Sequence, residues 1–203
     1  MSQHKNRSKG AALIIVLCAT LLAACSHSPS VQFYSLSPTP TSTGDAPLDL
    51  ALAIGPAQFP RSLARSQIVT RGSGSRVNVD EYHVWSAPLE YEFLRVLGDD
   101  IGSDIQSDRI AVYPREPAFN IDYRISLDVL QFDGVPGDSV TLRVRWAIAP
   151  PGGDAVAVNT FEITQPTGAS EDKEGYDALV LAHSAAIGAL AKSITEKLRT
   201  LDR

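Results

Sequence analysis

The sequence is poor in the residue types that build disulfides, metal centres and nucleophilic active sites. Its 203 residues include only two cysteines, one methionine and four histidines. It contains no C-x-x-C or H-E-x-x-H motif, no G-x-S-x-G nucleophile motif and no Gly-rich phosphate-binding loop. We therefore expect no catalytic centre, no cofactor and no metal ion, and we predict that the protein is not an enzyme.

The few titratable residues that could form a site have structural explanations. His183 falls on the apolar face of an expected helix, which favours a core histidine over a ligand. His83 lies beside Trp85 and has no partner at the spacing of a metal site. Asp128 belongs to the polar face of an expected strand and Asp133 to an expected turn, so a catalytic carboxylate pair is the weaker interpretation.

The N-terminus has the three zones of a secretory signal. A basic start is followed by an apolar run over residues 10–24 and by the sequence Leu22-Ala23-Ala24-Cys25, which fits a lipobox. We predict that residues 1–24 are a lipoprotein signal peptide, that Cys25 carries the lipid (palmitate among its acyl chains), and that residues 25–30 form a short tether. Ser26 follows the cysteine, and the absence of Asp there favours the periplasmic face of the outer membrane. An ordinary signal or anchor helix with a chance cysteine is the alternative.

Processing makes the chain more acidic and removes its free thiols. Three of the 18 basic residues lie in the signal, so 15 basic residues remain against 23 acidic ones. Such a balance, without a block of basic residues, argues against nucleic-acid binding. Cys18 leaves with the signal and Cys25 carries lipid, so the fold rests on its core alone. No later stretch is expected to reach membrane-spanning length, and residues 31–203 have the length of one domain.

Hydrophobic patterns divide residues 31–203 into strands and two helices. One helix is expected to open at Ser86 or Ala87 with Pro88 in its first turn, and the other to run from about 170 to 200. The expected strands are 31–36, 48–54 (stopped by Gly55-Pro56), 67–71, 77–79, 109–113, 121–129, 140–148 and 155–165, with an exposed loop at 37–47. Since the long strands have one apolar face each, we predict a single α+β domain: a two-layer sandwich with a mainly antiparallel sheet and two amphipathic helices covering one face.

A local cluster of basic residues interrupts this acidic chain. Four arginines occur between positions 61 and 76 with no acidic residue among them: Arg61, Arg65, Arg71 and Arg76. A solvated loop followed by a hairpin with a tip at 72–75 would explain them. Because guanidinium groups also bind phosphate and carboxylate, the arginines are candidates for contact with an anionic surface, either phospholipid headgroups or an acidic partner.

A series of short motifs follows the lipobox along the chain. They are Phe33-Tyr34-Ser35-Leu36, Ile54-Gly55-Pro56, Ser66-Gln67-Ile68-Val69, Trp85-Ser86-Ala87-Pro88-Leu89, Val112-Tyr113-Pro114, Asp122-Tyr123-Arg124-Ile125, Phe132-Asp133-Gly134 and Val140-Thr141-Leu142-Arg143-Val144-Arg145-Trp146. In this order they resemble the PqiC/YmbA family of ABC-type transport auxiliary lipoproteins, over nearly the whole chain after the signal. Ser66 departs from a frequent proline of that family, and Val84 and Ala87 depart from its usual pattern around the tryptophan.

The resemblance marks nine family-motif residues: Gln67, Ile68, Val69, Trp85, Pro88, Leu89, Tyr113, Pro114 and Trp146. It implies a non-enzymatic, outer-membrane-anchored auxiliary subunit of an MCE-type lipid transport system, associated with membrane integrity. Such a lipoprotein would be a homo-oligomer that docks the periplasmic tunnel of an MCE-domain protein at the outer membrane. Helix entry and core packing would also explain several of these residues. Two other functions stay open: an envelope-assembly scaffold without lipid cargo, and a periplasmic hydrolase.

Overall fold

The computed structural model describes residues 30–39, 45–72, 74–170 and 175–202. The chain separates into two compact units, Met1–Val31 and Gln32–Arg203, and the second contains the helices and strands that follow. The expected signal peptide and Cys25 lie outside the described residues, so lipidation stays a prediction. Residues 40–44 of the expected loop and residues 171–174 at the expected start of the last helix also lie outside them.

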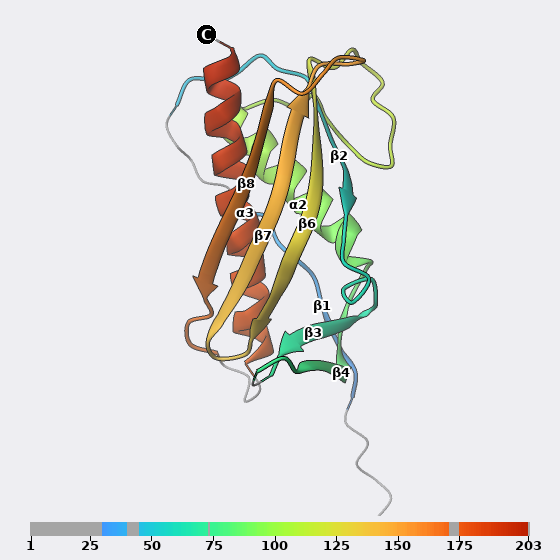
Figure 1. Cartoon of the computed structure of the whole chain (residues 1–203), viewed down its shortest axis with the longest axis vertical. Helices are drawn as coiled ribbons and strands as arrows, with labels where there is room; N and C mark the ends of the chain where they lie inside the picture. The colour runs from blue at the N-terminus through green and yellow to red at the C-terminus, as the bar shows by residue number, and fades with distance from the viewer. Residues whose placement is uncertain (1–29, 40–44, 73, 171–174, 203) are drawn as a thin grey trace, which may run out of the picture. The chain divides into compact units, whose positions relative to one another are not determined.

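The strands of the second unit form one sheet around the long strand β6 (Figure 1). They are β1 (Gln32–Tyr34), β2 (Leu52–Gln58), β3 (Gln67–Arg71), β4 (Val77–Trp85), β5 (Ile110–Val112), β6 (Tyr123–Val135), β7 (Ser139–Ala149) and β8 (Ala157–Pro166). One edge of β6 pairs with β7, which pairs in turn with β8. The other edge pairs with β2 near the start of β6 and with β3 near its end. β5 extends the sheet beyond β2, and β4 and β1 extend it beyond β3.

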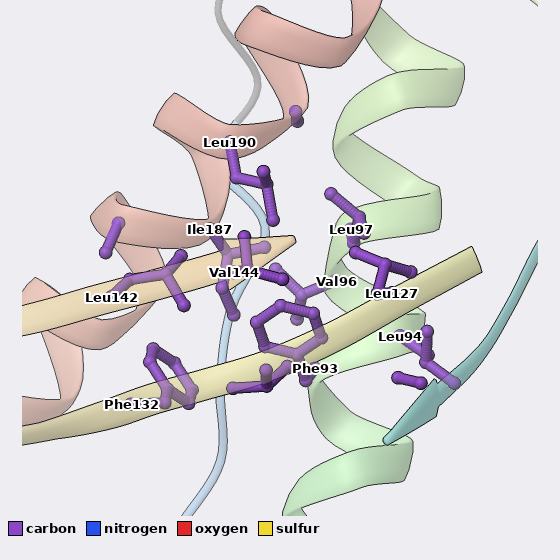
Figure 2. Packing of buried hydrophobic residues seen from close by; sticks show 14 of the residues in the cluster. Phe93, Leu94, Val96, Leu97, Leu127, Phe132, Leu142, Val144, Ile187 and Leu190 are labelled. Carbon is purple, nitrogen blue, oxygen red and sulfur yellow. The ribbon is translucent and has the colours of Figure 1, made fainter. Parts of the chain in front are cut away.

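Two helices pack on this sheet and on each other. α2 (Leu89–Ile105) contacts β2 and β5, and α3 (Tyr176–Leu201) contacts β6, β7 and β8. The apolar stripes predicted for both helices are buried, so these predictions are confirmed. Figure 2 shows the result in the core, where Phe93 of α2 and Ile187 of α3 lie close to Phe132 of the sheet.

The predicted α+β class with two helices is confirmed, but the prediction of a two-layer sandwich with a mainly antiparallel sheet is wrong. In the described part of the chain, four of the seven strand pairs are parallel: β1 with β4, β2 with β5, β2 with β6 and β3 with β6. Alternation along a strand shows that one face is covered, but it does not show the direction of the neighbouring strand. Parallel neighbours need a long crossover, which the chain supplies between β2 and β5 through α2. The sheet is also curled, as a half-barrel and not as a flat layer (Figure 1).

The predicted stop of the second strand at Gly55-Pro56 is also wrong, because β2 continues to Gln58. Gly55 has φ +102°, a left-handed value that suits glycine, and the pairing with β6 shifts register between Ile54 and Ala57. This irregularity is a bulge, which lets the strand pass the proline without ending.

α3 has the length and composition of a membrane-spanning helix. Its most apolar window has a mean hydropathy of 1.4, so the expectation that no later stretch reaches such a length is wrong. However, 72% of that window is buried inside the protein, against the sheet and α2. The apolar stripe therefore serves the core of the domain, as in other buried helices.

The segment after β1 lies against both helices, and we call residues 35–39 the N-terminal strap. Its backbone N–H groups donate hydrogen bonds to side chains of both helices: Leu36 to Glu92 at 3.2 Å, Thr39 to Asp100 at 2.8 Å and Ser37 to Ser184 at 3.2 Å. The strap is thus fastened to α2 through buried carboxylates and to α3 through a buried hydroxyl.

Candidate functional site

An apolar hollow near family-motif residues lies where the chain enters α2. It has a volume of about 500 Å³ and is lined by the loop before β3 and by the junction of β4 with α2. Its apolar lining includes Phe59, Leu63, Trp85, Pro88 and Leu89. Leu63, Trp85 and Leu89 are almost completely buried, so they form a solid floor and do not project into solvent.

A smaller hollow of about 120 Å³ adjoins the first and shares Pro88 and Glu90 with it. Tyr113 and Pro114 line this second hollow, together with residues of the first turns of α2. We call the two hollows together the motif groove, because five family-motif residues line it: Trp85, Pro88, Leu89, Tyr113 and Pro114.

The local sequence explains why these motifs meet. Pro88 directly precedes α2 and has φ −52° and ψ 129°, so the chain enters the helix from an extended residue. The Tyr113 N–H donates to the Ile54 carbonyl at 2.9 Å. Gly55 lets the two segments approach closely, because a Cβ at this position would lie 2.7 Å from the Tyr113 Cβ. The motifs around positions 88 and 113 therefore line adjoining hollows, and the buried Gly55 packs against Tyr113.

The groove has an apolar floor and a charged rim. The rim carries the exposed residues Arg65 and Glu90, which are of opposite sign. Among the described residues that line the groove, Glu90 is the one carboxylate and Arg65 the one basic group. Such a surface suits the burial of an apolar side chain from a partner, with polar contacts at the edge. It offers no paired acid and base for general acid–base chemistry.

The other family-motif residues do not reach this surface. Ile68 and Val69 are buried in β3, and Trp146 is buried in β7. Gln67 is half-buried and donates through Nε2 to Glu81 Oε2 at 3.2 Å. These four residues build the sheet, so the structure divides the motif set into residues of the fold and residues of the groove.

The structure does not gather the four arginines into one site. Arg61 and Arg65 precede β3, whereas Arg71 is the last residue of β3 and Arg76 directly precedes β4, in the predicted hairpin. Arg71 Nε donates to Asp133 Oδ2 at 2.9 Å, and this hydrogen bond raises the pKa of Arg71 above its usual value. Arg61, Arg65 and Arg76 are exposed, and no carboxylate of the described residues lies within 4.0 Å of them. Three of the four thus stay available for an anionic surface.

The two histidines of the described chain are core residues. His183 is 1% exposed, its Nδ1 lies 2.8 Å from the Leu179 carbonyl oxygen, and burial lowers its pKa to about 4. His83 stacks on Tyr176 at a ring distance of 3.8 Å and lies 3.2 Å from Asp80. The described residues contain no group of three His, Cys, Asp or Glu side chains that could hold a metal ion. The core interpretation of His183 is confirmed.

Sequence reasoning missed two parts of this region. Phe59 and Leu63 line the groove, but isolated apolar residues in a polar loop give no periodic signal. Asp100 is 1% exposed on α2, where burial raises its pKa to about 6. The one available hint was its place in an acidic pair, Asp99 and Asp100, on a helix whose neighbouring positions are apolar.

Comparison with known proteins places the fold. The chain matches the family described as ABC-type transport auxiliary lipoprotein component over residues 34–195. No curated protein sequence matches it significantly. The solved structure of an uncharacterized protein has a TM-score of 0.68 at 15% identity, with 84% of this chain and 99% of the other covered. A DUF330 protein from Xanthomonas campestris has a TM-score of 0.66 at 16% identity, with 81% and 93% covered.

At such low identity the two structural likenesses concern the fold alone. The family match includes every residue that lines the motif groove. The resemblance seen in the motifs is thereby confirmed: the chain belongs to the ABC-type transport auxiliary lipoprotein components, a family of lipoproteins that assist a transporter.

Proposed function

We propose that this protein is the outer-membrane-anchored auxiliary lipoprotein of an MCE-type lipid transport system. In this role, Cys25 carries the lipid anchor on the periplasmic face of the outer membrane, and the domain docks the distal end of the periplasmic tunnel formed by the MCE-domain protein. The protein acts as a homo-oligomer and performs no chemistry. The family description supports the transport role, and the outer membrane, the MCE partner and the oligomer are the finer parts of the proposal.

One observation carries the docking role: the motif groove collects residues from two separate family motifs into one surface. Positions 85–89, 113 and 114 are distant in sequence, yet they line adjoining hollows. Core packing requires buried Trp85 and Leu89, but it does not require the more exposed Pro88, Tyr113 and Pro114. A binding surface for a partner would explain the buried and the exposed motif residues together.

Site-specific variants of the lipidated protein test this role. Ala64 is exposed and lines the groove, so Ala64→Glu should introduce an unpaired charge at the contact without disturbing the core. Val158 on β8 is 63% exposed and lines neither hollow of the groove, which makes Val158→Glu the matched control. After mild solubilisation and affinity purification, an MCE-domain protein should co-purify with the parent and the control, but not with Ala64→Glu.

Two results would contradict the proposal. If Ala64→Glu retains the MCE-domain protein as well as the control does, the groove is not the contact. If a cell-wall or envelope-assembly protein is recovered in place of an MCE-domain protein, the scaffold function without lipid cargo replaces the transport function.

A further inference from the structure

An aromatic side chain stands exposed on the strand that follows the predicted lipid tether. Phe33 in β1 is 70% exposed, the largest exposure of any large apolar side chain in the described residues. On the adjacent strand β4, Tyr82 is 42% exposed. Neither ring contributes to the buried core, so the fold does not explain why aromatic residues occupy these positions.

The two rings belong to neighbouring strands. β1 and β4 run parallel, with Phe33 opposite Val84 and Gln32 opposite His83. Because paired residues share a face, Phe33 lies on the side of Val84, which is itself buried, while His83 points to the other face. Tyr82 is exposed just before His83, in a part of β4 where the pairing with β3 shifts register. The ring of His83 stacks on Tyr176 of α3, which identifies that other face as the inner one. Phe33 therefore projects from the outer face of the β1–β4 ladder, and we call Phe33 and the exposed Tyr82 of the adjacent strand the outer aromatic pair.

The predicted anchor restricts what this face can meet. Gln32 follows Cys25 by seven positions in the sequence. At no more than about 3.6 Å for each residue, the start of β1 lies within about 25 Å of the lipidated cysteine. Aromatic side chains favour the headgroup region of a bilayer, and a lipid anchor is commonly reinforced by a second membrane contact.

The charges on these strands are compatible with such a contact. Glu81, the exposed acid next to Tyr82, accepts a hydrogen bond from Gln67. Asp80 accepts a hydrogen bond from the Tyr82 N–H and lies next to His83. At the hairpin tip, the exposed Arg76 has no carboxylate of the described residues within 4.0 Å. An anionic headgroup is a suitable partner for such a cation.

From these observations we infer that the outer aromatic pair is a second membrane contact, which inserts into the headgroup layer beside the lipid anchor; this rests on the proposed lipidation of Cys25. The contact orients the domain. The N-terminal end of β1 faces the bilayer, and its C-terminal end joins the motif groove, since the Ser86 N–H donates to the Tyr34 carbonyl at 2.7 Å.

Tryptophan quenching in the lipidated full chain tests this contact. The native Trp85 and Trp146 are at most 5% exposed, so Phe33→Trp adds a single exposed indole. Val158→Trp at a site 63% exposed on β8 is the matched control. Each protein is reconstituted in phosphatidylethanolamine–phosphatidylglycerol vesicles that contain phosphatidylcholine brominated near the headgroup. We expect at least about twofold stronger quenching for Phe33→Trp than for Val158→Trp, because aromatic rings concentrate in that layer.

Each outcome of this experiment decides a question. Equal quenching of the two variants, when both float with the vesicles, overturns the membrane contact and leaves the lipid anchor standing. If neither variant floats with the vesicles, the lipidation of Cys25 is wrong and this inference fails with it. Circular dichroism confirms that both variants are folded.

Discussion

Gly188 of α3 and Thr39 of the N-terminal strap approach each other so closely that no side chain fits between them. A Cβ added at Gly188 would lie 2.3 Å from Thr39 Oγ1 and 3.3 Å from the Thr39 carbonyl oxygen. The backbone N–H of the same threonine donates to Asp100 of α2. The strap is therefore held between the two core helices.

Replacing this glycine should loosen the strap. Gly188→Ala would normally stabilise a helix by about 1 kcal/mol, because glycine is the weaker helix former. Here we expect a loss of about 1–3 kcal/mol instead, since the added methyl group collides with the strap. Urea denaturation measures the change. Lys192→Ala, at an exposed position of the same helix, should stay within about 0.5 kcal/mol of the parent. A Gly188→Ala variant more stable than the parent would show that the strap moves aside freely.

Asp100 should make the stability of the domain fall as the pH rises. Burial and the nearby carboxylates of Asp104 and Asp99 raise its pKa from 3.8 to about 6. A raised pKa stabilises the protonated form, so its contribution is complete below pH 3.8 and is lost as the pH rises through 6. Asp100→Asn carries no charge and keeps an acceptor for the Thr39 N–H. Relative to the parent, this variant should gain about 1–3 kcal/mol between pH 4 and pH 7 in urea denaturation. If the difference in unfolding free energy between Asp100→Asn and the parent does not vary with pH, the raised pKa of Asp100 is contradicted.

His183 should have the opposite effect in the same pH range. Burial lowers its pKa from 6.5 to about 4, so its contribution to stability is complete above pH 6.5 and is lost as the pH falls through 4. The proton NMR signals of its imidazole should stay unchanged between pH 8 and about pH 5, and move only near pH 4. A midpoint near pH 6.5 would show that solvent reaches the ring. Asp100 and His183 change the stability in opposite directions as the pH falls. The free energy of unfolding of Asp100→Asn should therefore decrease more steeply toward acid pH than that of the parent.

The sequence predicted those parts of the fold that periodicity reports. The stripes of α2 and α3 and the alternation in β6 and β7 follow from contact with one continuous core, and the structure has them where the patterns occur. Strand direction was missed, because alternation is the same whether the neighbour is parallel or antiparallel. The partners of β2 lie more than 50 residues along the chain, beyond the reach of any local pattern.

The candidate site was predicted in part, through motifs and not through chemistry. Trp85, Pro88 and Tyr113 were named from the family resemblance, and the structure brings them to one groove. Leu63 was missed because a single apolar residue in a loop carries no signal. Arg71 was grouped with its neighbours in sequence, whereas its partner Asp133 lies 62 positions away on β6.

The Arg71–Asp133 pair makes it possible to distinguish an arginine that stabilises the fold from one that is free to bind an anionic surface. Asp133 has a side-chain exposure of 7% and accepts a second hydrogen bond from Gln131 Nε2 at 3.0 Å. The pair adjoins Thr70 and Gly134, the residues through which β3 joins β6. Arg71→Ala would leave the buried carboxylate with one donor fewer, so we expect a loss of about 1–2 kcal/mol in urea denaturation. Amide exchange in β3 should also become faster.

Arg76→Ala is the matched control in the same hairpin, because Arg76 is exposed and no carboxylate of the described residues lies within 4.0 Å of it. Its stability should remain within about 0.5 kcal/mol of the parent. In an Asp133→Asn background the effect of Arg71→Ala should shrink, since the buried charge is gone. Equal effects of Arg71→Ala and Arg76→Ala would contradict a structural role for the pair. If Arg71→Ala is destabilising and Arg76→Ala is not, charge reversal at Arg76 is the informative test of binding to an anionic surface. Weaker binding after a change at Arg71 could result from lost stability as well as from a lost contact.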